Sequence, residues 1–117
     1  AYKITKKVAK VGFDWPDHAG VVEKIREETA EVAETLGLPD DDPHVAEELG
    51  DLLFVVVNLC RRRKVDPELA LFNANRKFER RFNAVEAALK EQGVSLASAG
   101  VEEMEAAWQA VKRTERA

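Results

Sequence analysis

Hydrophobic residues recur every three or four positions along most of this chain, and glycine and proline divide that pattern into segments. This spacing is typical of helices that bury one face, whereas the strict alternation of a half-buried strand is missing. The sequence therefore predicts an all-α fold, a helical bundle of about five helices. The expected helices cover roughly residues 1–10, 16–36, 43–64, 67–93 and 101–113.

Local signals at the ends of these segments support the division. Pro16 suits the first position of a helix, and Gly37 is a typical stop. Asp42 followed by Pro43 is typical of an N-cap and a first-turn proline, and Asp66 with Pro67 repeats that signal. The second and third helices are joined by a short loop, so we expect them to be antiparallel neighbours.

The expected third helix is hydrophobic on nearly every side, and such a helix must be buried on every side. One short chain of about five helices can hardly cover it. We therefore expect a partner chain that completes the bundle, most simply a twofold homodimer, or a higher homo-oligomer. The residues concerned are Val45, Ala46, Leu49, Leu52, Leu53, Phe54, Val55, Val56, Val57, Leu59 and Cys60.

The composition indicates one soluble globular domain over residues 1–117, with 34% charged and 45% hydrophobic residues. The net charge of −4 argues against a nucleic-acid polymer as partner. Cys60 is the only cysteine, which excludes an intramolecular disulfide and fits a reducing, cytoplasmic location. The longest apolar run, residues 52–57, is too short to span a membrane. Since no methionine starts the chain, we expect a processed chain or part of a longer protein.

Two acidic clusters stand out, EETAE at 27–31 and EELGD at 47–51. Each places two carboxylates three residues apart on one helix face, Glu28 with Glu31 and Glu48 with Asp51. An unpaired buried carboxylate is costly, so it is neutralised, paired or given a metal. If the two helices are antiparallel neighbours, four carboxylates converge, and a divalent cation is the simplest remedy for their repulsion.

The faces of these carboxylates matter more than their number. Glu28 belongs to the same stripe as Val21, Ile25 and Val32, so it points towards the core. On the third helix, Glu48, Asp51 and Asn58 share one side with Val55, and we expect Asp51 to have apolar neighbours as well.

All candidate ligands are oxygens, which favours Mg²⁺, with Mn²⁺ as a substitute. Neither histidine has the Glu-x-x-His spacing of a di-iron bundle. The alternative is that the glutamates are solvated and pair with bases such as Lys24. We favour that interpretation at least equally for Glu23, Glu27, Glu34 and Glu47.

Cations and aromatic residues occupy the last two predicted helices. Lys77 and Arg81, four residues apart beside the stripe Phe78, Phe82, Val85 and Leu89, could hold phosphate oxygens. The alternative is surface charge paired with glutamates, which we prefer for Arg76 and Arg80. Trp108 and Lys112 have the same spacing and could stack a base and meet a phosphate, although such a tryptophan is more often a core or interface residue.

Two other groups favour a structural interpretation. We expect Phe13 and Trp15 to serve in packing. The basic run at 61–64 complements the dipole at a helix C-terminus.

The order of these motifs resembles the all-α nucleoside triphosphate pyrophosphohydrolases, a superfamily that includes MazG, dimeric dUTPase and phosphoribosyl-ATP pyrophosphohydrolase. The resemblance is strongest to MazG, particularly its C-terminal catalytic domain, and it covers almost the whole chain. It rests on the segments VGFDWPD, KIREETAEVAE, EELGDLLFVVVNLCRR, VDPELAL, NRKFERRFNAVE and MEAAWQAVK.

The resemblance implies a role for each matching residue. The metal ligands would be Glu28, Glu31, Glu48 and Asp51. Substrate contacts would come from Lys24, Asn58, Lys77, Arg81, Trp108 and Lys112. Glu27 or Glu47 could accept the proton of the attacking water.

The implied reaction is Mg²⁺-dependent hydrolysis of a nucleoside triphosphate between its α and β phosphates, giving a nucleoside monophosphate and pyrophosphate. We expect broad-specificity clearance of the nucleotide pool. The alternatives are a cousin with a narrow substrate choice, such as a dUTPase or a phosphoribosyl-ATP pyrophosphohydrolase, and a non-catalytic helical interaction module.

Overall fold

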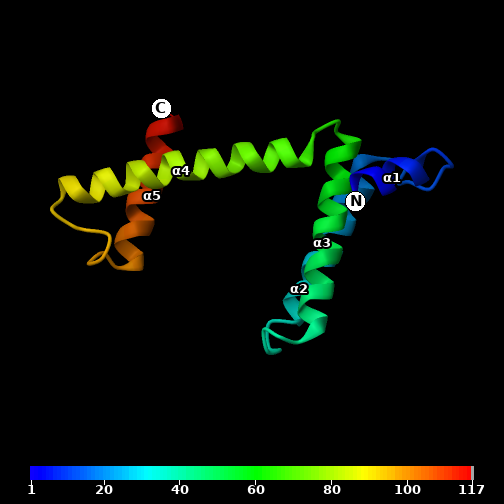
Figure 1. Cartoon of the computed structure of the whole chain (residues 1–117), viewed down its shortest axis with the longest axis horizontal. Helices are drawn as coiled ribbons and strands as arrows, with labels where there is room; N and C mark the ends of the chain where they lie inside the picture. Colours follow the sequence, from blue (N-terminus) through cyan, green and yellow to red (C-terminus); the bar gives the residue numbers. More distant parts are fainter. Residues whose placement is uncertain (117) are drawn as a thin grey trace. The chain divides into compact units, whose positions relative to one another are not determined.

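The computed structural model describes the backbone of residues 1–116 and the side chains of residues 1–115. The described residues form five helices and no strand, which confirms the all-α prediction (Figure 1). None of these helices has the length and apolar character that crossing a membrane would require. The helices are α1 (Tyr2–Ala9), α2 (His18–Glu34), α3 (Pro43–Arg62), α4 (Pro67–Glu91) and α5 (Val101–Arg116).

The helix starts follow the sequence signals, with one correction. The Asp42 carboxylate caps α3 by accepting a hydrogen bond from the His44 N–H at 2.9 Å, and Pro43 is the first helical residue, as predicted. At α2, however, the cap is Asp17, which accepts from the Gly20 N–H at 2.9 Å. Pro16 therefore precedes the helix instead of starting it, because the Asp17 side chain satisfies a free N–H of the first turn.

Helix ends use a left-handed residue at two places. Gly93 has φ 75°, and the Val94 N–H then donates to the Leu89 carbonyl at 2.9 Å, which closes the end of α4. Lys64 plays the same role after α3 with φ 59°, and there the Val65 N–H donates to the Cys60 carbonyl at 2.8 Å. Both connections satisfy carbonyl groups that a helix end leaves without a partner.

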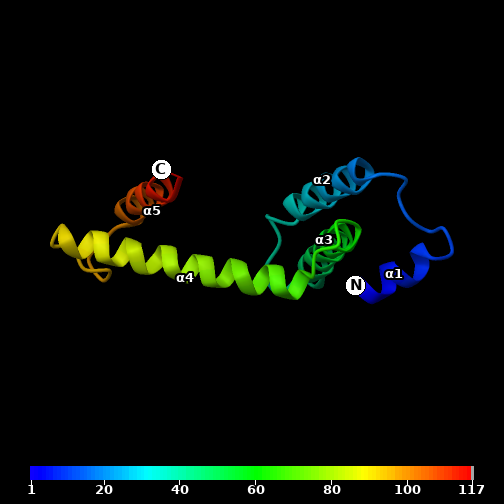
Figure 2. The same cartoon turned by 90° about the horizontal axis from the view of Figure 1, so that it is seen from above.

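The chain divides into two compact units, Ala1–Pro67 and Glu68–Ala117. In the first unit, α2 packs along α3, and α1 also contacts α3 (Figure 2). Val21 from α2 and Val55 from α3 form its buried apolar positions. The expected pairing of the second and third helices is thus confirmed.

A charged contact joins the turn before α2 to the end of α3. The Asp14 carboxylate accepts from Arg61 Nη2 at 2.6 Å and pairs with Arg62 Nη1 at 2.9 Å. Arg62 Nη1 also donates to the carbonyl of Trp15 at 2.7 Å. Partial burial raises the pKa of Asp14, but hydrogen bonds from Arg61, the Trp15 N–H and Arg62 outweigh it, so this pKa lies below its ordinary value. The first two arginines of the basic run therefore have specific partners besides the helix dipole.

Trp15 and Phe13 behave differently from each other. Trp15 lies over Gly20, where an added Cβ would come within 2.9 Å of its ring, so a residue without a side chain is needed there. Phe13 is 76% exposed, so the prediction that it packs is wrong within this chain. The turn that carries it follows Gly12, whose φ of 91° lies in the left-handed region that glycine adopts readily.

The second unit has its own small core between α4 and α5. Val85, Leu89 and Ala107 are buried, and side chains of the connecting segment pack against them. The predicted stripe on α4 is confirmed at Val85 and Leu89, whereas Phe78 is 57% exposed. Phe78 does not belong to this core, and its ring contacts the Trp108 ring of α5 instead.

The hydrophobic surface of α3 is only partly covered in the described chain. Its exposed large apolar residues are Leu49, Leu53, Phe54 and Val56. This agrees with the argument that one chain cannot bury this helix on all sides. Dimerisation itself stays a prediction.

Candidate active site

The packing of α2 on α3 brings the two acidic motifs together. Carboxylate oxygens of Glu28, Glu48 and Asp51 lie within 4.8 Å of one another, and the same holds for Glu27, Glu28 and Glu31. Glu28 is common to both groups, so it links the two helices. The predicted convergence of the two motifs is confirmed for Glu28, Glu48 and Asp51, whereas Glu31 is grouped only with residues of its own helix. We call the five residues of both groups the acidic cluster.

Glu28 is the most buried member of the acidic cluster, with 6% exposure, as its place in the core stripe predicted. Its Oε2 atom is buried without a hydrogen-bond partner, and so is Oε2 of Glu48. Buried oxygens without partners are rare and costly in folded proteins. Two such oxygens belong to carboxylates on neighbouring helices, and a cation bound between them would offset the free-energy cost of burying them.

Lys24, on α2, offsets part of the negative charge of Glu27 and Glu28. Its Nζ lies 3.1 Å from Glu27 Oε1 and 3.3 Å from Glu28 Oε1. Hydrogen bonds to Glu27 and Glu28 raise the pKa of Lys24, so the amine stays charged at neutral pH. One lysine contacts one oxygen of Glu28 and leaves the other free, so it cannot replace a multivalent ion.

Asp51 departs from its prediction. It belongs to the acidic cluster by distance, yet it is exposed, so the expectation that apolar neighbours bury it is wrong in this chain. The reason is geometric, since within the first unit only α2 and α1 contact α3. The side chains of Glu27 and Glu47 are 58% and 69% exposed and thus accessible to water.

His44 is a neighbour that the sequence interpretation overlooked. Its Nε2 lies 3.6 Å from Glu48 Oε1, and its Nδ1 lies 3.8 Å from Glu47 Oε2. The signal was available, because His44 and Glu48 are four residues apart on one helix and therefore share a face. The Glu-x-x-His spacing by itself does not reveal this contact.

The acidic cluster fits a hard divalent cation. Its donors are all carboxylate oxygens, which Mg²⁺ and Mn²⁺ prefer. The unpartnered buried oxygens of Glu28 and Glu48 could coordinate such an ion, and the exposed Asp51 leaves the cluster open to an incoming ligand. Glu31 lies next to Glu28 as a further donor.

Asn58 lies on the same helix as Asp51 but is only 2% exposed. Its Oδ1 accepts a hydrogen bond from Arg61 Nε at 3.0 Å, and Arg61 in turn pairs with Asp14. The carbonyl end of Asn58 is thus fixed by the contact that holds the turn before α2. The amide N–H groups of Asn58 are the groups that could donate to a phosphate oxygen.

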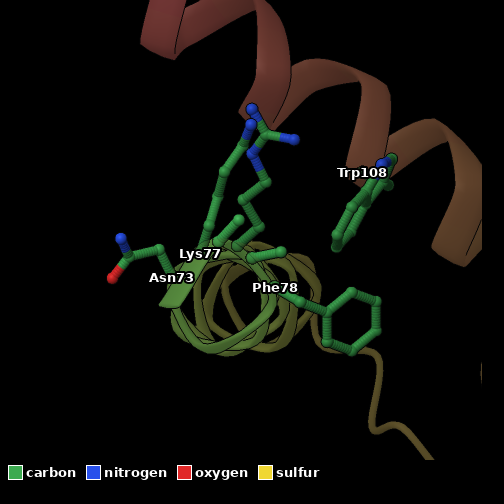
Figure 3. Close-up of a pocket in the computed structure, with 7 residues that line it drawn as sticks. Asn73, Lys77, Phe78 and Trp108 are labelled. Carbon is green, nitrogen blue, oxygen red and sulfur yellow. The ribbon is translucent and has the colours of Figure 1, made fainter. Parts of the chain in front are cut away.

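The second unit contains a pocket of about 420 Å³, a size suited to a small-molecule ligand. Asn73, Lys77 and Phe78 extend from α4, and Trp108 reaches towards them from α5 (Figure 3). Arg81 also contributes, so the predicted pair of cations lines one pocket with the predicted aromatic residue. Asn73 was not predicted; its spacing of four residues before Lys77 could have indicated it.

Arg81 lies beside the aromatic residues of this pocket. Its guanidinium carbon lies 5.9 Å from the centre of the Trp108 ring, and the Phe78 and Trp108 rings are 5.2 Å apart. Lys112 is partly buried on α5 but does not line the pocket. Its substrate contact, inferred from the spacing to Trp108, stays a prediction.

The fold and the sites define a class, an all-α protein with two antiparallel acidic helices and a basic, aromatic pocket. A family model described as the MazG nucleotide pyrophosphohydrolase domain matches residues 17–86, more than half of the chain. The chain belongs to the MazG family.

Individual relatives extend the likeness over nearly all of the sequence. A nucleoside triphosphate pyrophosphohydrolase of Escherichia coli K12 is 46% identical over 116 residues, or 98% of this chain and 44% of that protein. The nucleoside triphosphate pyrophosphohydrolase/pyrophosphatase MazG of Thermotoga maritima is 42% identical over 96% of this chain and 42% of its own length. An uncharacterized Bacillus subtilis protein, YabN, is 48% identical over 59% of this chain. The chain thus spans less than half the length of the relatives it matches.

Proposed function

We propose that this chain hydrolyses nucleoside triphosphates to nucleoside monophosphates and pyrophosphate with Mg²⁺, and that Mn²⁺ can substitute. The observation that carries the proposal is the convergence of Glu28, Glu48 and Asp51, with two buried oxygens that lack partners. Support comes from the names of the E. coli and T. maritima relatives, which match nearly the whole chain.

The acidic cluster would hold the cation through Glu28, Glu31, Glu48 and Asp51. A divalent ion in such a site stabilises negative charge on phosphoryl oxygens and lowers the pKa of water. The carboxylates are acceptors only, so they orient water molecules and repel a phosphate that arrives without a cation. This explains why we expect no activity without a divalent metal.

A proton must leave the attacking water, and the exposed carboxylates are the candidates to accept it. The Glu27 carboxylate already accepts a hydrogen bond from Lys24, which would weaken it as a base. Glu47 is 69% exposed, and the His44 Nδ1 that faces it lies 3.8 Å away, beyond hydrogen-bond distance, so its carboxylate is less occupied than that of Glu27. We favour Glu47 for this reason, and a comparison of Glu27→Gln with Glu47→Gln tests the choice.

The pocket of the second unit would bind the nucleotide. Lys77 and Arg81 supply positive charge for phosphate oxygens, and Arg81 adds the planar fork that suits them. Trp108 offers an aromatic face for the base, which attracts any nucleobase because every base has a π-face. Because stacking on Trp108 tolerates every base, we propose broad specificity.

We further propose that the working form is a homodimer or a higher homo-oligomer in the cytoplasm. The exposed apolar residues of α3, Leu49, Leu53, Phe54 and Val56, supply the surface for a second copy. The single cysteine and the nucleotide substrate fit a reducing compartment.

A nucleotide panel tests this function. Canonical and modified nucleoside triphosphates would be incubated with the chain in Mg²⁺, in Mn²⁺ and in chelator, and the products separated by ion-exchange chromatography. Release of pyrophosphate with many substrates supports the proposal. Activity on a single nucleotide would instead favour a dedicated enzyme such as a dUTPase, and no release with any metal would leave a non-catalytic module.

A further inference from the structure

The guanidinium of Arg81 already has an anionic partner inside the second unit. Its Nε and Nη2 atoms both lie 2.8 Å from Oε2 of Glu115 on α5. The Arg81 side chain is 18% exposed and that of Glu115 is 40% exposed, so the acid lies on the solvent side of the pair. Hydrogen bonds from Arg81, together with nearby Arg80 and Lys77, hold the pKa of Glu115 below its ordinary value.

Glu115 contacts the edge of the Arg81 guanidinium that is also best suited to bind a phosphate. The Nε and Nη2 groups form the fork that grips two oxygens of a carboxylate or phosphate. With both N–H groups directed at Oε2 of Glu115, a phosphate at that edge must share them or displace the acid. The charges repel as well, so an incoming phosphate meets a carboxylate at its own binding position.

We propose that Glu115 is an internal competitor for the phosphate groups of the ligand and sets the affinity of the pocket through Arg81. This inference rests on the proposed function, because it takes Arg81 to be a phosphate contact. When the ligand binds, Glu115 swings to solvent and the guanidinium turns its fork to the phosphate oxygens. Only the fraction of molecules in which Arg81 is released can then bind the ligand, and the apparent Kd rises in inverse proportion to that fraction.

The competition also selects the class of ligand. Glu115 is attached to the same unit, so its effective concentration at Arg81 is high, and a free singly charged anion gains little by replacing it. A pyrophosphate group carries several charges and can meet Lys77 as well, since both cations line the pocket. Glu115 therefore discriminates in favour of polyphosphates.

The test measures binding of inorganic pyrophosphate by calorimetry, in chelator so that only the pocket contributes. We expect Glu115→Gln to bind pyrophosphate roughly two- to fivefold more tightly than the wild type, the range expected for losing a partly exposed ion pair. Glu115→Asp keeps the charge but shortens the side chain, so it should also bind more tightly. Glu105→Gln is the matched control, because Glu105 lies on the same helix and bonds to Gln109 instead.

The outcomes separate this inference from the proposed function. Tighter binding by both Glu115 variants, with the Glu105 control close to wild type, supports it. Equal or weaker binding by Glu115→Gln overturns the inference. If Arg81→Ala binds less tightly than the wild type in that case, the phosphate role of Arg81 still stands. If Arg81→Ala binds pyrophosphate as well as the wild type does, the inference and the proposed phosphate pocket fail together.

Discussion

Replacing Glu28 by glutamine removes one charge from the acidic cluster and keeps the size of the side chain. Oxygens of Glu28, Glu48 and Asp51 lie within 4.8 Å of one another. Two unit charges at such a separation repel by about 3–4 kcal/mol at an effective dielectric constant of about 20. The substitution also removes the pairing of Glu28 with Lys24 at 3.3 Å, an attraction of similar size. Without a divalent ion these changes offset each other, so the variant should fold.

Addition of Mg²⁺ should then separate the variant from the wild type. An ion that binds only the folded cluster stabilises it by about 1.4 kcal/mol at ten times its Kd and by about 2.7 kcal/mol at a hundred times. For a domain of this size, each kcal/mol raises the Tm by about 4 °C. We therefore expect a rise of about 6 °C in wild type at ten times the Kd. The rise in Glu28→Gln should be less than about a third of that, because this variant lacks a ligand shared by both acidic groups.

The assay is thermal unfolding followed by far-ultraviolet circular dichroism, with Mg²⁺ titrated at constant ionic strength. Glu34→Gln is the matched control, because Glu34 is exposed at the end of the same helix and outside the cluster. The control should respond to Mg²⁺ as the wild type does. An equal Mg²⁺ response in Glu28→Gln, or no response in the wild type, would refute the assignment of the acidic cluster as a metal site.

Three further substitutions test other parts of the account. The Asp14 carboxylate stabilises the fold fully at pH values above its ordinary pKa of 3.8. This stabilisation is lost as the pH falls through the lower pKa that Asp14 has in the folded chain. Asp14→Asn should thus lower the free energy of unfolding by about 1–2 kcal/mol at neutral pH, and the difference from wild type should shrink in acid. Leu89→Ala should cost about 2–4 kcal/mol in urea unfolding, because Leu89 is 1% exposed between α4 and α5; a smaller loss would mean that this core is loosely packed. Trp108→Leu should raise the KM for nucleoside triphosphates about tenfold and change kcat less, and an unchanged KM would exclude stacking on this ring.

The local parts of the structure could be predicted from the sequence because their causes are local. Hydrophobic spacing placed all five helices, and the Asp42-Pro43 signal gave the start of α3 at its observed residue. The core stripe of α2 predicted that Glu28 is buried, since a position on a helix face follows from spacing alone. The short connection between α2 and α3 was enough to predict that the acidic motifs meet.

What could not be predicted depends on contacts between distant residues. The exposure of Asp51 depends on which helices cover α3, and spacing on α3 carries no such information. The pairing of Asp14 with Arg61 joins residues 47 apart, and that of Arg81 with Glu115 joins residues 34 apart. Many acids and bases occur along this chain, so only the folded backbone selects which of them pair.

The most direct test of the central claim is product analysis with a nucleoside triphosphate and Mg²⁺, comparing wild type with Asp51→Asn. Asp51 is exposed, so its substitution leaves the packing intact, and unfolding curves would verify this. The wild type should form nucleoside monophosphate and pyrophosphate only with the metal, and Asp51→Asn should form almost none. Pyrophosphate release at the wild-type rate by Asp51→Asn, or cleavage to nucleoside diphosphate and phosphate, would contradict the central claim.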